Sequence, residues 1–271
     1  VGVAINLFDI DIGGKSNLGK HTALVDLQGE IAPDTKASAD AINASLQAAF
    51  ENSESVGVIL RINSPGGSPV QSGIIHDEML RLRAKYPEKS LHVVVEEICA
   101  SGGYYVASAA ENIYVDKASL VGSIGVIMNG FGVTGLMEKL GIERRAITAG
   151  KNKALLDPFS KQDPKQKEFV QGMIGEVHEQ FIKVVRSGRG DRLKETPDMF
   201  SGLVWNGAKS VELGLSDGLG SVDGVARDVF KSPTIVDYTM KDNLAERVAK
   251  RFGAAMGEGA TRVLMYGGQL R

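Results

Sequence analysis

The sequence is poor in the residues that build disulfides and metal sites. It holds one cysteine, Cys99, so no disulfide can form within the chain. Its four histidines, His21, His76, His92 and His178, are scattered, and none stands at a zinc-ligand spacing from the cysteine. These absences exclude a disulfide-stabilised fold and argue against metal catalysis, and we expect no cofactor.

The chain also lacks a strong net charge and a long apolar run. Its formal net charge is −2 over 271 residues, so no basic surface predicts nucleic-acid binding. No apolar run approaches the roughly 20 residues that a membrane-spanning helix needs. The sequence begins with Val1 rather than methionine, which indicates a processed or truncated chain and leaves room for a removed N-terminal signal or anchor.

Hydrophobic periodicity predicts strands that alternate with helices. Strands are predicted at 21–31, 56–62 and 91–98, with helices at 39–50 and 70–86 between them. This alternation is typical of parallel βαβ units and therefore of an α/β fold. The later part of the chain predicts short strands at 112–116, 122–127, 144–148 and from Trp205, and helices at 104–110, 134–140, 164–187 and 222–230.

Three parts are predicted along the chain: a lead-in at 1–20, a main domain at 21–231 and a C-terminal helical extension at 232–271. The lead-in contains GGKS at 13–16, which lacks the first glycine of a P-loop and is not interpreted as a phosphate site. The extension carries a basic amphipathic helix at 242–258, which could pack on the domain, bind a neighbouring subunit or lie on a membrane.

Two glycine-rich turns follow predicted strands, ASGGYY at 100–105 and NSPGG at 63–67. Open α/β sheets bind ligands where their parallel strands end. A serine at such a turn has an exposed hydroxyl beside free backbone N–H groups, so Ser101 is a candidate nucleophile. The N–H of Gly102 and the 65–67 loop are candidate oxyanion donors. The competing interpretation is an ordinary N-cap serine.

A serine nucleophile needs a base, and the residue pattern leaves its identity open. His92 begins the strand that precedes Ser101, which places it roughly 20 Å or more away at the strand rise per residue. His76, on the helix after the second turn, is one candidate. Lys151 and Lys153, in a loop after a predicted strand, are others, because a desolvated lysine gives up its proton more readily.

Four motifs stand in order along the chain: NSPGG at 63–67, ASGGYY at 100–105, GSIGV at 122–126 and GKNK at 150–153. With GLSDGLG at 214–220, this order resembles the signal peptide peptidase A family of serine peptidases, in its short single-domain form, over about residues 21–224. The resemblance implies a fold like the Clp protease proteolytic subunit and the crotonases. It also implies a serine endopeptidase that hydrolyses hydrophobic peptides, such as cleaved signal peptides and membrane-associated fragments.

The resemblance carries roles onto single residues. Ser101 matches the nucleophile of the family, and Lys153 matches its general base. Ser123 matches the serine that orients the lysine. Gly67 and Gly102 match the oxyanion-hole donors.

Two positions depart from the family pattern. Cys99 stands where a small residue is expected, and we interpret it as a buried apolar filler. Ala154 follows Lys153 where the family often has aspartate, which leaves Lys151 as the reserve base.

The resemblance also implies partners and a location. Short members of the family form rings in which the serine of one subunit meets the lysine of a neighbour, so we expect a ring-shaped homo-oligomer with a shared dyad. Members are anchored in the bacterial inner membrane with the catalytic domain facing the periplasm or cell exterior. We therefore expect membrane association through a segment absent from this sequence.

Two other functions stay open. A crotonase-like acyl-CoA enzyme has a similar oxyanion hole but uses carboxylates, and Glu96 and Glu97 are the nearest in sequence to Ser101. The second alternative is an inactive, membrane-associated binding scaffold, against which the intact set of Ser101, Ser123 and Lys153 argues. A serine-directed acylating inhibitor distinguishes a peptidase from a hydratase, because only the peptidase is modified at Ser101.

Overall fold

An eight-stranded sheet forms the centre of the computed structural model, which describes residues 19–240. Its strands are β1 (His21–Gln28), β2 (Ser55–Ser64), β3 (Leu91–Ala100), β4 (Asn112–Val115), β5 (Leu120–Gly122), β6 (Val204–Asn206), β7 (Gly218–Leu219) and β8 (Ile235–Asp237). The main path runs β6-β5-β3-β2-β1-β8, with β4 beside β3 and β7 beside β4. The paired strands run parallel, except that β6 is antiparallel to β5.

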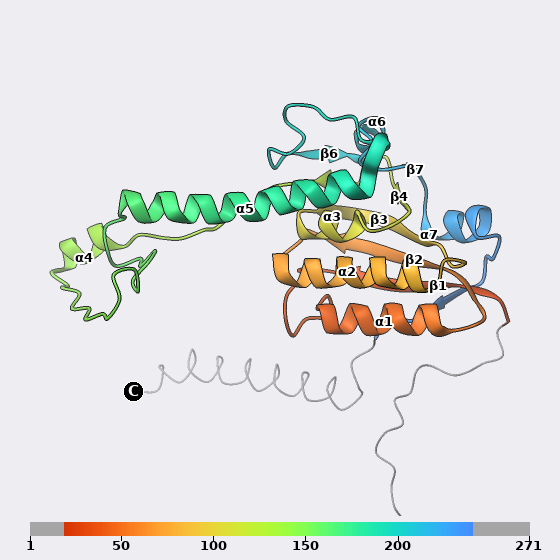
Figure 1. Cartoon of the computed structure of the whole chain (residues 1–271), viewed down its shortest axis with the longest axis horizontal. Helices are drawn as coiled ribbons and strands as arrows, with labels where there is room; N and C mark the ends of the chain where they lie inside the picture. The colour runs from red at the N-terminus through yellow and green to blue at the C-terminus, as the bar shows by residue number, and fades with distance from the viewer. Residues whose placement is uncertain (1–18, 241–271) are drawn as a thin grey trace, which may run out of the picture.

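Helices cover both faces of the sheet. Helices α1 (Ala39–Glu51), α2 (Pro69–Lys85) and α3 (Gly102–Ala107) lie side by side over one face (Figure 1). On the other face, the π-helix η2 (Val225–Val229) packs its buried Val225 and Ala226 against Leu24, Ile59 and Val94. The other helices are α4 (Thr134–Leu140), α5 (Pro164–Arg189), η1 (Gly190–Arg192), α6 (Gly207–Glu212) and α7 (Val222–Gly224).

The central strands explain why the sequence folds this way. Ile59 and Leu60 are neighbours in β2 that point to opposite faces, and both are fully buried. Parallel strands covered on both faces need such continuous apolar runs. The helices that follow begin at serines, since Ser38 Oγ accepts the Ala41 N–H at 3.4 Å and Ser68 Oγ accepts the Gln71 N–H at 3.3 Å. The α/β fold with a mostly parallel sheet is therefore confirmed.

Some predicted boundaries were wrong. The strand predicted at 122–127 ends at Gly122, and residues 123–133 form no helix or strand. The strand predicted at 144–148 is also absent from the described structure, because that segment is exposed and has no neighbouring strand to pair with. Strand β8 lies beyond residue 231 and pairs with β1. The predicted helix at 242–258 and the GGKS at 13–16 lie outside the described residues.

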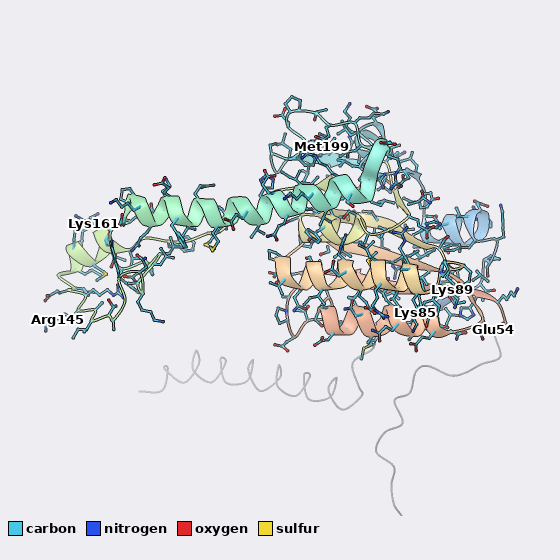
Figure 2. The ribbon with its side chains drawn as sticks, viewed as in Figure 1. Glu54, Lys85, Lys89, Arg145, Lys161 and Met199 are labelled. Carbon is cyan, nitrogen blue, oxygen red and sulfur yellow. The ribbon has the colours of Figure 1, made fainter. Side chains whose placement is uncertain are left out.

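Residues 126–163 and the outer part of α5, residues 164–177, form an arm that extends away from the sheet (Figure 1). Arg145 and Lys161 mark its far end (Figure 2). Within the arm, the Val133 N–H donates to the Pro158 carbonyl at 2.8 Å, and Arg144 is paired with Asp157. Several large apolar side chains of the arm are more than half exposed: Ile127, Phe131, Leu136, Leu140, Ile147 and Phe169.

A buried ion pair holds the inner end of α5 on the sheet. Arg189 is fully buried and donates to the two carboxylate oxygens of Asp217 at 2.8 and 2.9 Å. Asp217 also accepts the Ile113 N–H at 2.7 Å. Burial acts to raise the pKa of this carboxyl, but the hydrogen bonds and charge of Arg189 outweigh it and hold the pKa of Asp217 below its usual value. In the described part of the chain, neither α5 nor another helix is long and apolar enough to cross a bilayer.

Replacing Asp217 by asparagine leaves the Arg189 guanidinium buried without its counter-charge. We expect Asp217→Asn to lower the free energy of unfolding at neutral pH by about 3 kcal/mol. A carboxyl with a lowered folded-state pKa stabilises the fold above its unfolded pKa and loses this contribution as the pH falls. The difference in the free energy of unfolding between the unmodified protein and Asp217→Asn, measured by urea denaturation, should therefore become smaller as the pH falls.

The matched control is Asp228→Asn, which breaks the exposed pair between Arg227 and Asp228. We expect this control to unfold at the same urea concentration as the unmodified protein. Equal midpoints for Asp217→Asn and Asp228→Asn would contradict a stabilising role for the buried pair.

Candidate active site

Ser101 lies at the turn between β3 and α3, where the parallel strands end. Its backbone has φ 50° and ψ −122°, which is rare for a residue with a side chain and costs of order 1–3 kcal/mol. Two backbone hydrogen bonds hold it: its N–H donates to the Gly122 carbonyl at 2.8 Å, and its carbonyl accepts the Tyr105 N–H at 3.0 Å. The side chain makes no capping hydrogen bond, unlike those of Ser38 and Ser68. Its hydroxyl therefore does not serve as an N-cap.

The turn at Gly66 and Gly67 packs directly on the Ser101 turn. A Cβ on Gly66 would lie 2.6 Å from the Gly102 nitrogen and 2.8 Å from the Ser101 Cβ, and a Cβ on Gly102 would lie 3.2 Å from the Gly67 nitrogen. Only glycine permits this approach. Among the described residues, no backbone acceptor takes the N–H of Gly67 or Gly102, so both are available to bind an oxyanion between the turns.

Ser64 and Ile31 hold the first of these turns in place. Ser64 Oγ donates to the Gly29 carbonyl at 2.6 Å and accepts the Gly66 N–H at 3.1 Å. The Gly66 carbonyl accepts the Ile31 N–H at 2.9 Å, and Gly66 has φ 100°. No role of Ser64 or Ile31 could be predicted, because nothing in the NSPGG motif indicates which backbone groups its serine will bind.

Ser123 lies beside Ser101 at the end of β5. The Gly122 carbonyl that accepts the Ser101 N–H belongs to the residue before it. Ser123 also has a positive φ, 53°, and its N–H donates to the Leu203 carbonyl at 2.7 Å. Four of the five predicted site residues, Ser101, Ser123, Gly67 and Gly102, thus lie at one edge of the sheet.

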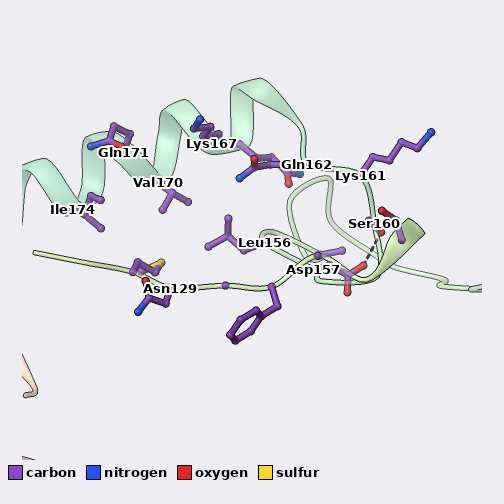
Figure 3. Close-up of a pocket in the computed structure, with 17 residues that line it drawn as sticks. Asn129, Leu156, Asp157, Ser160, Lys161, Gln162, Lys167, Val170, Gln171 and Ile174 are labelled. Atoms are coloured by element: carbon purple, nitrogen blue, oxygen red, sulfur yellow. Dashed lines mark hydrogen bonds between the residues drawn. The ribbon is translucent and has the colours of Figure 1, made fainter. Parts of the chain in front are cut away.

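Lys153, the fifth, lies on the arm in an exposed loop where its N–H donates to the Gly150 carbonyl at 3.1 Å. The adjacent Ala154 lines a cleft of about 490 Å³ between this loop and the outer part of α5. Figure 3 shows Leu156 in this cleft opposite Val170 of α5. The lysine loop therefore belongs to the outer part of the arm.

Helix α5 gives the scale of the separation. Val170 lines the cleft beside Ala154, whereas Phe181 contacts Tyr105, one turn of α3 beyond Ser101, with 5.2 Å between ring centroids. The eleven residue steps of α-helix from Val170 to Phe181 correspond to a rise of about 16 Å. Within one chain, the structure does not bring the lysine loop to the serine.

The histidines considered as bases have other partners. His76 Nδ1 lies 3.1 Å from Asp77 Oδ1, and its ring packs edge-on against Tyr105. His92 stacks on Phe230 at 5.0 Å, at the opposite end of β3 from Ser101, and burial lowers its pKa. Cys99 is fully buried, and burial raises the pKa of its thiol, which agrees with its interpretation as a filler.

The carboxylates of the acyl-CoA alternative face a different cleft. Glu96 Oε1 lies 3.1 Å from Arg61 Nη1, and Arg61 also makes a two-point contact with Asp26. Glu96 and Glu97 line a cleft of about 890 Å³ whose lining contains no residue of the Ser101 turn. Within residues 19–240, no three His, Cys, Asp or Glu side chains are grouped so as to hold a metal ion.

Comparison with known families adds to this geometry. The family model described as peptidase family S49 matches residues 83–232, more than half of the chain. This chain belongs to peptidase family S49. The resemblance to the signal peptide peptidase A family, stated above from the motifs, is thereby confirmed. The sheet and its covering helices are consistent with the Clp protease-like fold of the family.

Three relatives illustrate the similarity. The Na(+)/H(+) antiporter NhaA of Brucella melitensis is 42% identical over 185 residues, which are 68% of this chain and 25% of that protein. A Methanocaldococcus jannaschii protein with a provisional protease name is 34% identical over 225 residues, 80% of this chain and 71% of its own. Protease 4 of Haemophilus influenzae is 30% identical over 213 residues, 76% of this chain and 34% of its own. The chain spans about a quarter of the length of the Brucella protein, so the antiporter activity in that protein's name is not assigned to this chain.

The contact between the two turns can be tested by adding one methyl group. We expect Gly66→Ala to lower peptide hydrolysis by at least about a hundredfold, because its Cβ separates the Gly67 and Gly102 amides. The measurement is the initial rate of peptide cleavage at equal concentrations of folded protein.

Gly73→Ala is the matched control, because Gly73 lies in α2 and a Cβ there meets nothing within 4 Å. We expect it to retain activity and to stabilise the helix by about 0.5–1 kcal/mol. If Gly66→Ala were as active as Gly73→Ala, a role of the contact between the two turns in catalysis would be contradicted.

Proposed function

We propose that this protein is a serine endopeptidase with a serine–lysine dyad. In this proposal Ser101 is the nucleophile, Lys153 is the general base, and Ser123 orients the lysine. The N–H groups of Gly67 and Gly102 bind the oxyanion. The observation that carries the proposal is a Ser101 hydroxyl that makes no capping hydrogen bond, beside the N–H groups of Gly67 and Gly102, for which residues 19–240 supply no backbone acceptor.

The reaction follows from these positions. Ser101 Oγ attacks the scissile carbonyl carbon while the neutral amine of Lys153 takes the hydroxyl proton. The carbonyl oxygen becomes an oxyanion that accepts hydrogen bonds from Gly67 and Gly102. The carbon–nitrogen bond then breaks, the lysine ammonium gives its proton to the leaving amine, and an acyl-enzyme remains. Water attacks this ester with the lysine again as base, which releases the acid and restores Ser101.

We further propose that Lys153 acts on Ser101 of a neighbouring subunit in a ring-shaped homo-oligomer. The separation along α5 supports this, because Lys153 lies on the outer arm and Ser101 lies at the edge of the sheet. The exposed apolar side chains of the arm, such as Phe131 and Ile147, also favour a covered surface. A head-to-tail contact of arm on body closes into a ring if the rotation between subunits allows it.

Hydrophobic peptides are the substrate class that the surface favours. Val70 and Ile74 lie one turn apart on α2, just after the Gly67 turn, and their exposed fractions are 67% and 46%. An apolar side chain of a bound peptide would cover them. Cleaved signal peptides and membrane-associated fragments have this composition, and we propose them as substrates. An acyl-CoA activity is disfavoured, because the Glu96 carboxylate is paired with Arg61 in another cleft.

A shared dyad predicts complementation between two inactive proteins. We expect Ser101→Ala and Lys153→Ala each to abolish cleavage of a hydrophobic peptide. When the two variants are dissociated, mixed in equal amounts and reassembled, about one quarter of the sites should combine an intact serine with an intact lysine. The measurement is the cleavage rate of the mixture relative to the unmodified protein.

Each variant reassembled alone serves as the control and should stay inactive. Mixtures with no recovered activity would contradict a dyad shared between subunits. Lys151→Ala tests the reserve base in the same loop and should retain activity. If Lys151→Ala were inactive and Lys153→Ala active, the base would be Lys151.

The pH dependence tests the chemical nature of the base. A lysine ammonium cannot accept the serine proton, so only the neutral amine is active. We therefore expect kcat/KM for peptide cleavage to keep rising with pH on the alkaline side of neutrality. A profile that levels off near neutral pH would instead indicate a histidine base.

A further inference from the structure

His178 makes a contact that the proposed mechanism does not use. It lies on α5 where this helix leaves the sheet, and its Nε2 lies 3.2 Å from the Ile124 carbonyl. Because a carbonyl only accepts, Nε2 is the donor in this hydrogen bond. Among the described residues, it is the one side-chain hydrogen bond between α5 and residues 123–133.

The segment that His178 contacts carries Ser123. On one side, the Ser123 N–H donates to Leu203, and a Cβ on Gly125 would lie 3.2 Å from Gly202. On the other side stands His178. Residues 123–125 thus contact both residues 202–203, just before β6, and α5. The positive φ of Ser123 needs this support, because a side-chain-bearing residue does not keep such a conformation without it.

The His178–Ile124 hydrogen bond joins the two segments that connect the arm to the body, which is the sheet with its covering helices. The chain enters the arm after Gly125 and returns along α5, so a bond from Ile124 to His178 ties the outgoing and returning segments at the base of the arm. Farther in, Phe181 contacts Tyr105 and Arg189 binds Asp217, which fixes the inner end of α5. Farther out, the helix has exposed residues such as Phe169. His178 therefore lies between the attached inner end of α5 and its exposed outer part.

We propose that His178 is a positioning residue that fixes the arm and the Ser123 segment relative to Ser101. Its catalytic consequence rests on the proposed function, because Lys153 is carried by the arm and must reach a neighbouring serine. His178 does not transfer a proton in this proposal. A side-chain amide that donates an N–H at a similar distance should therefore substitute for the imidazole of His178.

The experiment compares His178→Phe, which keeps the ring but removes the donor, with His178→Gln, which supplies an N–H at similar reach. We expect His178→Phe to lower kcat for a hydrophobic peptide by about tenfold or more, with KM little changed, because a small displacement of catalytic groups costs this much. His178→Gln should restore most of kcat. Glu179→Gln, on the same helix and exposed, is the matched control and should behave like the unmodified protein.

A second readout does not depend on catalysis. Spin labels on Ala84→Cys of α2 and Lys139→Cys of α4 report the arm-to-body distance, and buried Cys99 should stay unlabelled. Dilution with unlabelled protein removes distances between subunits. We expect a narrow distribution for the unmodified histidine and for His178→Gln, and a broader one for His178→Phe.

The outcomes separate the two proposals. A wild-type protein that neither cleaves peptides nor reacts at Ser101 with a fluorophosphonate overturns the proposed function, while the spin-label distances still decide the role of His178. Unchanged distances and unchanged kcat in His178→Phe overturn the positioning role. Equal impairment of His178→Gln and His178→Phe, with distances unchanged, would assign the imidazole itself a chemical role and also overturn it.

Discussion

The backbones of two turns touch where β2 and β3 end, and the rest of the candidate site depends on this contact. A Cβ on Gly66 would lie within 2.8 Å of both the Gly102 nitrogen and the Ser101 Cβ, so side chains are excluded from the interface. The contact places two backbone N–H groups beside one hydroxyl. Parallel pairing of β2 with β3 supplies the geometry, because it ends both strands at the same edge of the sheet.

The GLSDGLG run at 214–220 connects this contact to the arm. The hydroxyl of buried Tyr104, in helix α3 directly after Ser101, donates to the Leu215 carbonyl at 2.7 Å. Two residues later, Asp217 binds Arg189 at the inner end of α5. One short segment therefore holds both the helix that follows Ser101 and the helix that carries the arm. None of its residues takes part in the proposed reaction. These structural contacts therefore give a physical reason for its place in the motif order.

The sequence predicted the parts of the site that depend on local chemistry. Ser101, Gly102 and Gly67 lie in turns whose glycines, and whose position after apolar strands, can be read directly from the chain, whereas Ser123 was predicted within a strand and was singled out by the family resemblance. The sheet and its first helices were predicted for the same reason, because apolar runs and apolar residues at helical spacing are visible within a few residues of sequence. The predicted strand at 144–148 failed because a strand also requires a partner, and sequence periodicity does not show whether one is present.

Contacts between distant residues were beyond sequence reasoning. His178 and Ile124 are 54 positions apart, and a histidine on an amphipathic helix carries no signal for the carbonyl it will bind. The same limit applies to Arg189, which is fully buried although the sequence presents it as an ordinary charged helix residue. Arginine is retained in such a place only with a partner that meets its planar donors, and Asp217 does so 28 positions away.

The separation of Lys153 from Ser101 has a structural cause of the same kind. Ser101, Gly67 and Gly102, to which the proposal gives the roles of nucleophile and oxyanion donors, lie at the edge of the sheet, whereas Lys153 stands on a loop whose own contacts lie within the arm. Hydrogen bonds at two places, Arg189 and His178, tie α5 to the rest of the chain at and near the sheet. In the proposed mechanism, a base carried by this arm acts on the serine of another molecule rather than on its own. The attachments of α5 that separate Lys153 from Ser101 within one chain would then give the proposed dyad a defined geometry between two chains.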